Sequence, residues 1–389
     1  MTHVAAYGIG QGLDGRDAAM QATQKALDQL GALRPALALA IVSEEYDAAE
    51  AAGGLSGLLG DTPVWGMSSV LPLAGESEQP RSVLVVLLAG SDLKASVNWW
   101  PSFAADSQET ARQVIRVLRS DLILPQAVLL AADGVNGSLT ALCTGLADLP
   151  ANIGGCLASG GYTSGKTYLL AKGQSGPGGL ATAALGGRFR LSTGTAHGWR
   201  DSGLQCSLTR TRDVWVQTVD GAPAAELYAR YFGHSAREWA YPPLNDLARL
   251  YPFGVETYSG SPDLLLRSPL RVEVDGSLRM SAPVTEGATA HLMLGDPEAC
   301  LHAVETAARD ALNGLGIARP MVALAFVDLA WQYLFNTRSG QVAHAIQDAL
   351  GSIAVVGAYT LGQVARPNAT AAPEIYNQSV EIVLIGYQQ

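Results

Sequence analysis

A pattern of secondary structure that occurs three times is the strongest constraint on how this 389-residue chain folds. Each unit contains a helical segment, an apolar strand, a helix of small residues, a short strand with glycine and a last apolar strand. The first apolar strands end at Ser43, Asp133 and Asp328. The glycine strands follow as PVWGMSS, NIGGCLAS and AVVGAYT, and the last strands as SVLVVLLAG, GLATAALGG and SVEIVLIG.

The apolar strands are continuous rather than alternating, which indicates sheets that helices cover on both faces. We therefore predict an α/β protein in which three related helix-strand-helix-strand-strand units form helix-covered sheets. Residues 188–294 break the repeat with several tryptophans and hairpin-like turns, and they predict a mixed α/β insertion between units two and three. The expected regions are 1–190, with units one and two, and 191–389, with the insertion and unit three from about 295.

Composition excludes several classes of protein. Hydrophobic residues make up 48% and charged residues 15%, which excludes extended disorder. A net charge of −10 disfavours nucleic acid and anionic membranes as partners. Because the longest apolar runs fall well short of the roughly 20 residues of a membrane span, and because no secretory signal is visible, we expect a cytoplasmic protein.

Metal and nucleotide motifs are weak. The cysteines and histidines lack zinc-ligand spacing, so we predict no metal site and no cofactor, although haem needs only one axial histidine and stays open. Residues 160–167 (GGYTSGKT) match the P-loop pattern, but the glycines and proline that follow favour a hairpin over the helix that phosphate binding needs.

The ends of the strands are the best candidates for a binding site, because ligands of open α/β sheets bind beyond the carboxyl ends of strands. A pocket between units one and three would combine Ser68, Asp328, Tyr359 and His197. We predict no catalytic residue, but Ser68 or Asp328 would be the reactive group if the protein were a hydrolase. The full set of candidate ligand-binding residues is Ser68, Ser69, Asp328, Trp331, Tyr359, Thr360, His197, Arg200 and Asn377.

A series of short motifs in the right order resembles the FIST family, with its FIST N and FIST C domains. The most specific is VDGAPAAELYARYFG from Val219, and the others include HGWRDSG, YPFGV, DGSLRMSAPVTEGA, GAYTLGQV and YNQSVEIVL. The resemblance implies a sensory protein that binds a small molecule, such as an amino acid or similar metabolite, and signals through a partner protein. It also leaves a haem-bound nitric oxide sensor open. Asp328 and Trp331 stand where family members often carry cysteine and arginine, which favours a different, amine-bearing ligand or none.

Overall fold

The computed structural model describes residues 4–121, 124–160, 166–258, 260, 264–366 and 371–388. Unit one consists of β1 (Val4–Gly10), α1 (Gly15–Leu30), β2 (Leu37–Ser43), α2 (Ala48–Leu59), β3 (Val64–Ser69), β4 (Pro72–Ala74), β5 (Ser77–Glu78) and β6 (Val83–Ala89). Unit two consists of β7 (Lys94–Trp100), α3 (Ser107–Ser120), β8 (Ala127–Asp133), α4 (Thr140–Gly145), β9 (Asn152–Ala158), β10 (Leu169–Ala171), β11 (Gln174–Gly176) and β12 (Leu180–Gly186).

Unit three repeats this order after a long interruption. It consists of β13 (Phe189–His197), α7 (Pro297–Leu315), β22 (Arg319–Asp328), α8 (Ala330–Phe335), η2 (Asn336–Arg338), α9 (Gly340–Leu350), β23 (Val355–Thr360), β24 (Gln363–Ala365), β25 (Glu374–Tyr376) and β26 (Ser379–Tyr387). The α/β class and the three related units are confirmed.

Each unit begins with a strand that the predicted order omitted. β1, β7 and β13 pair antiparallel with the last strand of their own unit, β6, β12 and β26. These first strands are edge strands with partly exposed residues, so their sequences lack the continuous apolar run that marks the inner strands.

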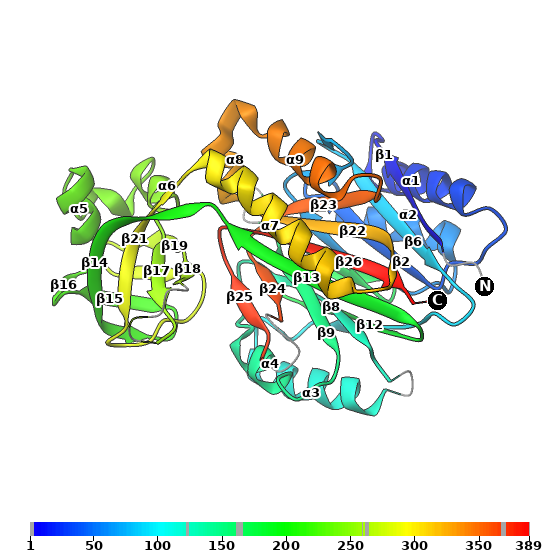
Figure 1. Cartoon of the computed structure of the whole chain (residues 1–389), viewed down its shortest axis with the longest axis horizontal. Coiled ribbons are helices and arrows are strands. Elements are labelled where there is room, and N and C mark those ends of the chain that lie inside the picture. The colour runs from blue at the N-terminus through cyan, green and yellow to red at the C-terminus, as the bar shows by residue number, and fades with distance from the viewer. Residues whose placement is uncertain are drawn as a thin grey trace.

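The units exchange hairpins in a closed cycle. In each sheet the first apolar strand and the glycine strand run parallel, and a hairpin from another unit completes the sheet. The hairpin β10–β11 of unit two joins β3 of unit one, β24–β25 of unit three joins β9, and β4–β5 of unit one joins β23. Because each sheet depends on strands from two units, the units form one body rather than separate domains (Figure 1).

Two kinds of apolar layer hold this body together. The inner faces of the three sheets share one core, with Leu39, Leu129 and Leu324 at matching positions. The outer faces are covered by α1 and α2, by α3 and α4, and by α7, α8 and α9. Burial on both faces explains why the central strands are almost entirely apolar.

Glu381 is the exception in the shared core. It lies on β26 where the matching positions of units one and two carry Leu84 and Ala181, and it is completely buried. Its carboxyl oxygens lie near the backbone N–H groups of Gly155 and Val364 but form no well-aligned hydrogen bond with a described residue. Burial raises the pKa of Glu381 well above its usual value.

The glycine of each parallel pair is required by close backbone contact. A Cβ on Gly66, Gly155 or Gly357 would lie 2.7, 2.0 or 2.1 Å from a carbonyl oxygen of the neighbouring strand. The repeat of this residue therefore reflects strand packing in all three units.

The insertion is a separate antiparallel domain, seen at the left of Figure 1. It consists of β14 (Trp199–Arg212), β15 (Trp215–Val219), β16 (Ala222–Pro223), α5 (Glu226–Phe232), η1 (Glu238–Ala240), α6 (Leu244–Ala248), β17 (Phe253–Glu256), β18 (Leu264–Arg267), β19 (Pro269–Val272), β20 (Leu278–Met280) and β21 (Thr289–Gly295). Tyr228, Trp239 and Phe253 are buried in its own core. It joins the body through two connections, β13 to β14 and β21 to α7.

The central residues of the P-loop-like segment, 161–165, lie outside the described residues, and the chain beyond them forms the hairpin β10–β11 instead of a helix. No helix in the described part of the chain is both long and apolar enough to cross a membrane.

Candidate functional site

Four of the nine predicted residues lie at the carboxyl ends of glycine strands: Ser68 and Ser69 end β3, and Tyr359 and Thr360 end β23. Ser68 Oγ donates to the Ser159 carbonyl at 3.0 Å and accepts from the backbone N–H of Tyr168 at 3.0 Å. Ser69 Oγ donates to the Tyr359 carbonyl at 2.9 Å. Ser159, which sequence reasoning did not select, donates its hydroxyl to the same carbonyl. These buried hydroxyls connect the three units to one another.

Tyr359 and Thr360 are also buried where the ends of the three glycine strands meet, a region that we call the crossing. The phenol of Tyr359 is 3.1 Å from Glu78 Oε1 on the hairpin that unit one contributes. Thr360 Oγ1 donates to the Val327 carbonyl at 3.3 Å and accepts from Gln363 Nε2 at 2.9 Å. The polar atoms of both side chains therefore have protein partners.

Two more predicted residues, Asp328 and Trp331, contact the turn between β25 and β26, and a third, Asn377, is part of that turn. The oxygens of Asp328 accept from the backbone N–H groups of Ala330 and Gln378 at 3.0 and 2.7 Å. Trp331 Nε1 donates to the Gln378 carbonyl at 2.9 Å. Asn377 Oδ1 accepts from the hydroxyl of Ser281, a residue of the insertion domain, at 2.7 Å. Burial raises the pKa of Asp328 to about 6, despite the two N–H donors that act in the opposite direction.

His197 and Arg200 lie at the junction of the body and the insertion domain. His197 Nδ1 accepts from the backbone N–H of Trp199 at 3.3 Å, and burial lowers the pKa of the imidazole, which favours the neutral ring. Arg200 is exposed and pairs with Asp296 at 2.9 Å. Seven of the nine predicted residues are buried, and none of the nine lines the cleft described next.

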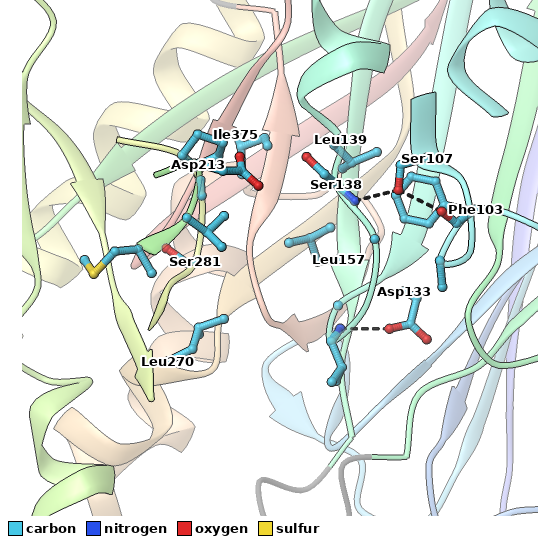
Figure 2. A pocket seen from close by; sticks show the side chains of 18 of the residues that line it. Phe103, Ser107, Asp133, Ser138, Leu139, Leu157, Asp213, Leu270, Ser281 and Ile375 are labelled. Carbon is cyan, nitrogen blue, oxygen red and sulfur yellow. Dashed lines mark hydrogen bonds between the residues drawn. The ribbon is translucent and has the colours of Figure 1, made fainter. Parts of the chain in front are cut away.

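A cleft of about 440 Å³ lies between unit two and the insertion domain. It opens at the carboxyl end of the parallel pair β8–β9, which is where α/β sheets bind ligands. Figure 2 shows Phe103, Ser107, Ser138 and Leu139 on one side, facing Asp213, Leu270 and Ser281 on the other. The described residues that line it are Phe103, Ala104, Ala105, Asp106, Ser107, Gln108, Asp133, Gly134, Val135, Gly137, Ser138, Leu139, Leu157, Asp213, Val214, Leu270, Arg279, Met280, Ser281, Ala282, Pro283 and Ile375.

The wall from unit two is held by Asp133. This buried carboxylate accepts from the backbone N–H groups of Val135 and Asn136 at 2.8 Å each, from Thr167 Oγ1 at 2.8 Å and from the Gly178 N–H at 2.7 Å. Four donors match the acceptor capacity of a carboxylate, so Asp133 shapes the loop that follows β8. The prediction from the sequence that a strand ends at Asp133 is confirmed, because β8 ends at this residue.

The first turn of α3 is part of the same wall. Asp106 caps the helix by accepting from the Glu109 N–H at 2.9 Å. Ser107 Oγ accepts from the backbone N–H of Ser138 at 2.8 Å, which ties the helix to the loop after β8. The conformation of this loop and the start of α3 are therefore linked.

The wall from the insertion domain carries two charges with spare bonding capacity. Asp213 is an exposed residue in the turn between β14 and β15, with φ of 55°, and its carboxylate has no hydrogen bond or ion pair with any residue that the structure describes. Arg279, on β20, is half-buried and donates from Nη2 to the Val135 carbonyl at 3.3 Å. Among the lining residues that the structure describes, Arg279 is the one cation, and no described carboxylate pairs with it.

Sequence reasoning selected neither Asp213 nor Arg279. Arg279 is the one basic residue in DGSLRMSAPVTEGA, and Asp213 lies between two segments of strand-like sequence, TRTR and VWVQTV. A charged residue in a predicted hairpin turn is common on any surface, so neither signal was specific.

Comparison with models of protein families shows which family the chain belongs to. The FIST N domain family matches residues 36–222, and the FIST C domain family matches residues 224–366. The chain belongs to the FIST family. FIST domains are associated with the sensing of small ligands in signalling proteins. In this FIST protein, Asp213 and the unit-two wall fall within the FIST N match, whereas Arg279 falls within the FIST C match. The cleft is thus lined by both family domains.

Among solved structures, cyanuric acid hydrolase from A. caulinodans is similar over the full length of both chains, with 9% identity and a TM-score of 0.38. No curated protein matches the sequence.

Proposed function

We propose that this FIST protein is a sensor that binds a small zwitterion, such as an amino acid, in the cleft between unit two and the insertion domain, and signals through a partner protein. The observation that carries the proposal is the presence of Arg279 and Asp213, opposite charges without ion-pair partners among the described residues, on one wall of one cleft. A volume of about 440 Å³ suits a small molecule.

The two charges supply complementary recognition. The guanidinium of Arg279 has five N–H donors and uses one toward Val135, so its remaining donors can bind a carboxylate in the bidentate manner that arginine favours. The carboxylate of Asp213 can accept from an ammonium group. Leu139, Leu157 and Ile375 give the cleft apolar surface for the rest of the ligand.

The candidate residues around the β25–β26 turn acquire a different role in this proposal. Ser281 lines the cleft and donates to Asn377, and the next residue, Gln378, is held by Asp328 and Trp331 of unit three. A ligand that draws the insertion domain toward unit two would therefore also displace Ser281 relative to the β25–β26 turn, which Asp328 and Trp331 of unit three hold in place. The signal would be a shift in the equilibrium between two arrangements of the insertion domain relative to the three units, because a ligand stabilises the arrangement that it binds best.

The direct test is a thermal-shift screen of the protein amino acids, followed by calorimetry on the best ligand. At 100 times its dissociation constant a ligand stabilises the folded state by about 2.7 kcal/mol. We expect Arg279→Gln to weaken binding roughly 10- to 100-fold, since a hydrogen bond to a charged group contributes about 1.5–3 kcal/mol. Asp213→Asn should weaken it about tenfold by the same reasoning. Arg210→Gln, at an exposed position of β14, is the matched control and should bind normally.

Other outcomes would identify a different function. Binding that survives both cleft substitutions but is lost in Asp328→Asn would place the ligand at the β25–β26 turn instead. Consumption of the ligand by the wild-type protein would identify an enzyme. A purified protein with strong Soret absorbance, lost when His197 is replaced, would identify a haem sensor.

A further inference from the structure

One face of α3 concentrates positive charge in an acidic protein. Arg112, Arg116 and Arg119 are four and three residues apart, so they project from the same side of the helix. Together they span about 10 Å along its axis. All three are exposed, in a chain with 25 basic and 35 acidic residues. This face is therefore positively charged, although the chain as a whole carries a net negative charge.

The three arginines retain bonding capacity. Arg112 pairs within the helix with Glu109 at 2.8 Å, and Arg119 lies 4.0 Å from Asp148. Arg116 forms no ion pair with any residue in the described ranges. The arginines line a shallow depression of about 470 Å³, to which Ile115 contributes a half-buried apolar side chain.

We infer that this arginine face, made of Arg112, Ile115, Arg116 and Arg119, binds an acidic segment of a partner protein. Guanidinium groups pair well with carboxylates, and arginine is favoured at protein interfaces. A partner helix with glutamates at the same four- and three-residue spacing would place its carboxylates opposite the arginines, with an apolar side chain against Ile115. The net charge of −10 disfavours a polyanionic nucleic acid at this face.

The arginine face is connected to the cleft through the same helix. α3 begins at Ser107, which lines the cleft and accepts a hydrogen bond from the loop after β8. A ligand that contacts this loop would alter the first turn of the helix whose outer face binds the partner. This link makes the arginine face an output surface, and this part of the inference rests on the proposed function.

Binding to the arginine face can be tested without knowing the partner. The probe is a fluorescent helical peptide of about five turns, with glutamates at matching spacing and leucine between them, compared with a peptide in which glutamine replaces glutamate. We expect the glutamate peptide alone to bind, with an affinity that falls as salt is added. Arg116→Glu should weaken binding at least about tenfold.

The matched control is Arg309→Glu, at an exposed position of the long helix α7, and it should leave peptide affinity unchanged. Equal binding of the two peptides, equal loss in both variants, or tighter Arg116-dependent binding of single-stranded DNA would overturn the inference. Circular dichroism of each variant confirms that it is folded.

Coupling to the cleft is measured by repeating the titration with a saturating mixture of the protein amino acids. A change in peptide affinity that Arg279→Gln abolishes supports the output role, whereas an unchanged affinity despite amino-acid binding overturns it. If no amino acid binds, the proposed function fails, and the peptide titration without amino acids still decides whether the arginine face is a binding surface.

Discussion

The crossing of the three units and the cleft beside the insertion domain both lie at carboxyl ends of parallel strands, yet their polar groups differ. At the crossing, the hydroxyls of Ser68, Ser69 and Ser159 are buried and bonded to backbone groups of another unit. In the cleft, Asp213 and Arg279 have spare bonding capacity and contact with solvent. Position at a strand end is therefore shared by structural and candidate binding residues, and spare bonding capacity separates them.

The largest expected effect tests the packing of the glycine strands. Gly155→Ala would place a Cβ 2.0 Å from the Leu130 carbonyl oxygen, so we expect a loss of about 4 kcal/mol or more in the free energy of unfolding, or no soluble protein. Gly57→Ala is the control, because its helical position is open and alanine should stabilise α2 by about 0.5–1 kcal/mol. Chemical denaturation measures both, and a mild effect at Gly155 would contradict the close packing of β8 and β9.

The second prediction concerns the buried carboxyl in the shared core. Burial raises the folded-state pKa of Glu381, so ionisation of this carboxyl lowers the free energy of unfolding. The loss of stability is absent below the unfolded-state pKa and grows as the pH rises toward the folded-state pKa. Glu381→Gln removes this ionisation, so its melting temperature should exceed that of the wild type by more at pH 8 than at pH 5. Glu226→Gln, on the exposed side of α5, should show no such trend. A constant difference between pH 5 and pH 8 would contradict a raised pKa.

The smallest expected effects separate the crossing from the cleft directly. Ser159→Ala removes the acceptor of the Val70 N–H and a donor to the Tyr359 carbonyl, so it should cost about 1–3 kcal/mol of stability without altering ligand affinity. Asp213→Asn should change stability by less than about 0.5 kcal/mol, since asparagine tolerates the positive φ of this turn. Denaturation and calorimetry on both variants give the comparison, and a reversed pattern would place the binding function at the crossing.

Much of the fold could be predicted from the pattern of apolar residues. The continuous apolar runs that end at Ser43, Asp133 and Asp328 indicate strands buried on both faces, and the structure has strands at residues 37–43, 127–133 and 319–328. The hairpin exchange could not be predicted, because β4, β10 and β24 are short and their partners lie in other units. The residues of a strand this short do not indicate which distant strand it will pair with.

The candidate site shows the same division. The sequence by itself determined the three repeated units, the insertion and the FIST relationship, because these depend on local periodicity and on motif order. Only the tertiary structure decided that Ser68 and Asp328 are buried and bonded whereas Asp213 and Arg279 line a cleft. The physical reason is that a polar group's bonding capacity is filled by neighbours that are distant in sequence, as when Ser69 meets Tyr359.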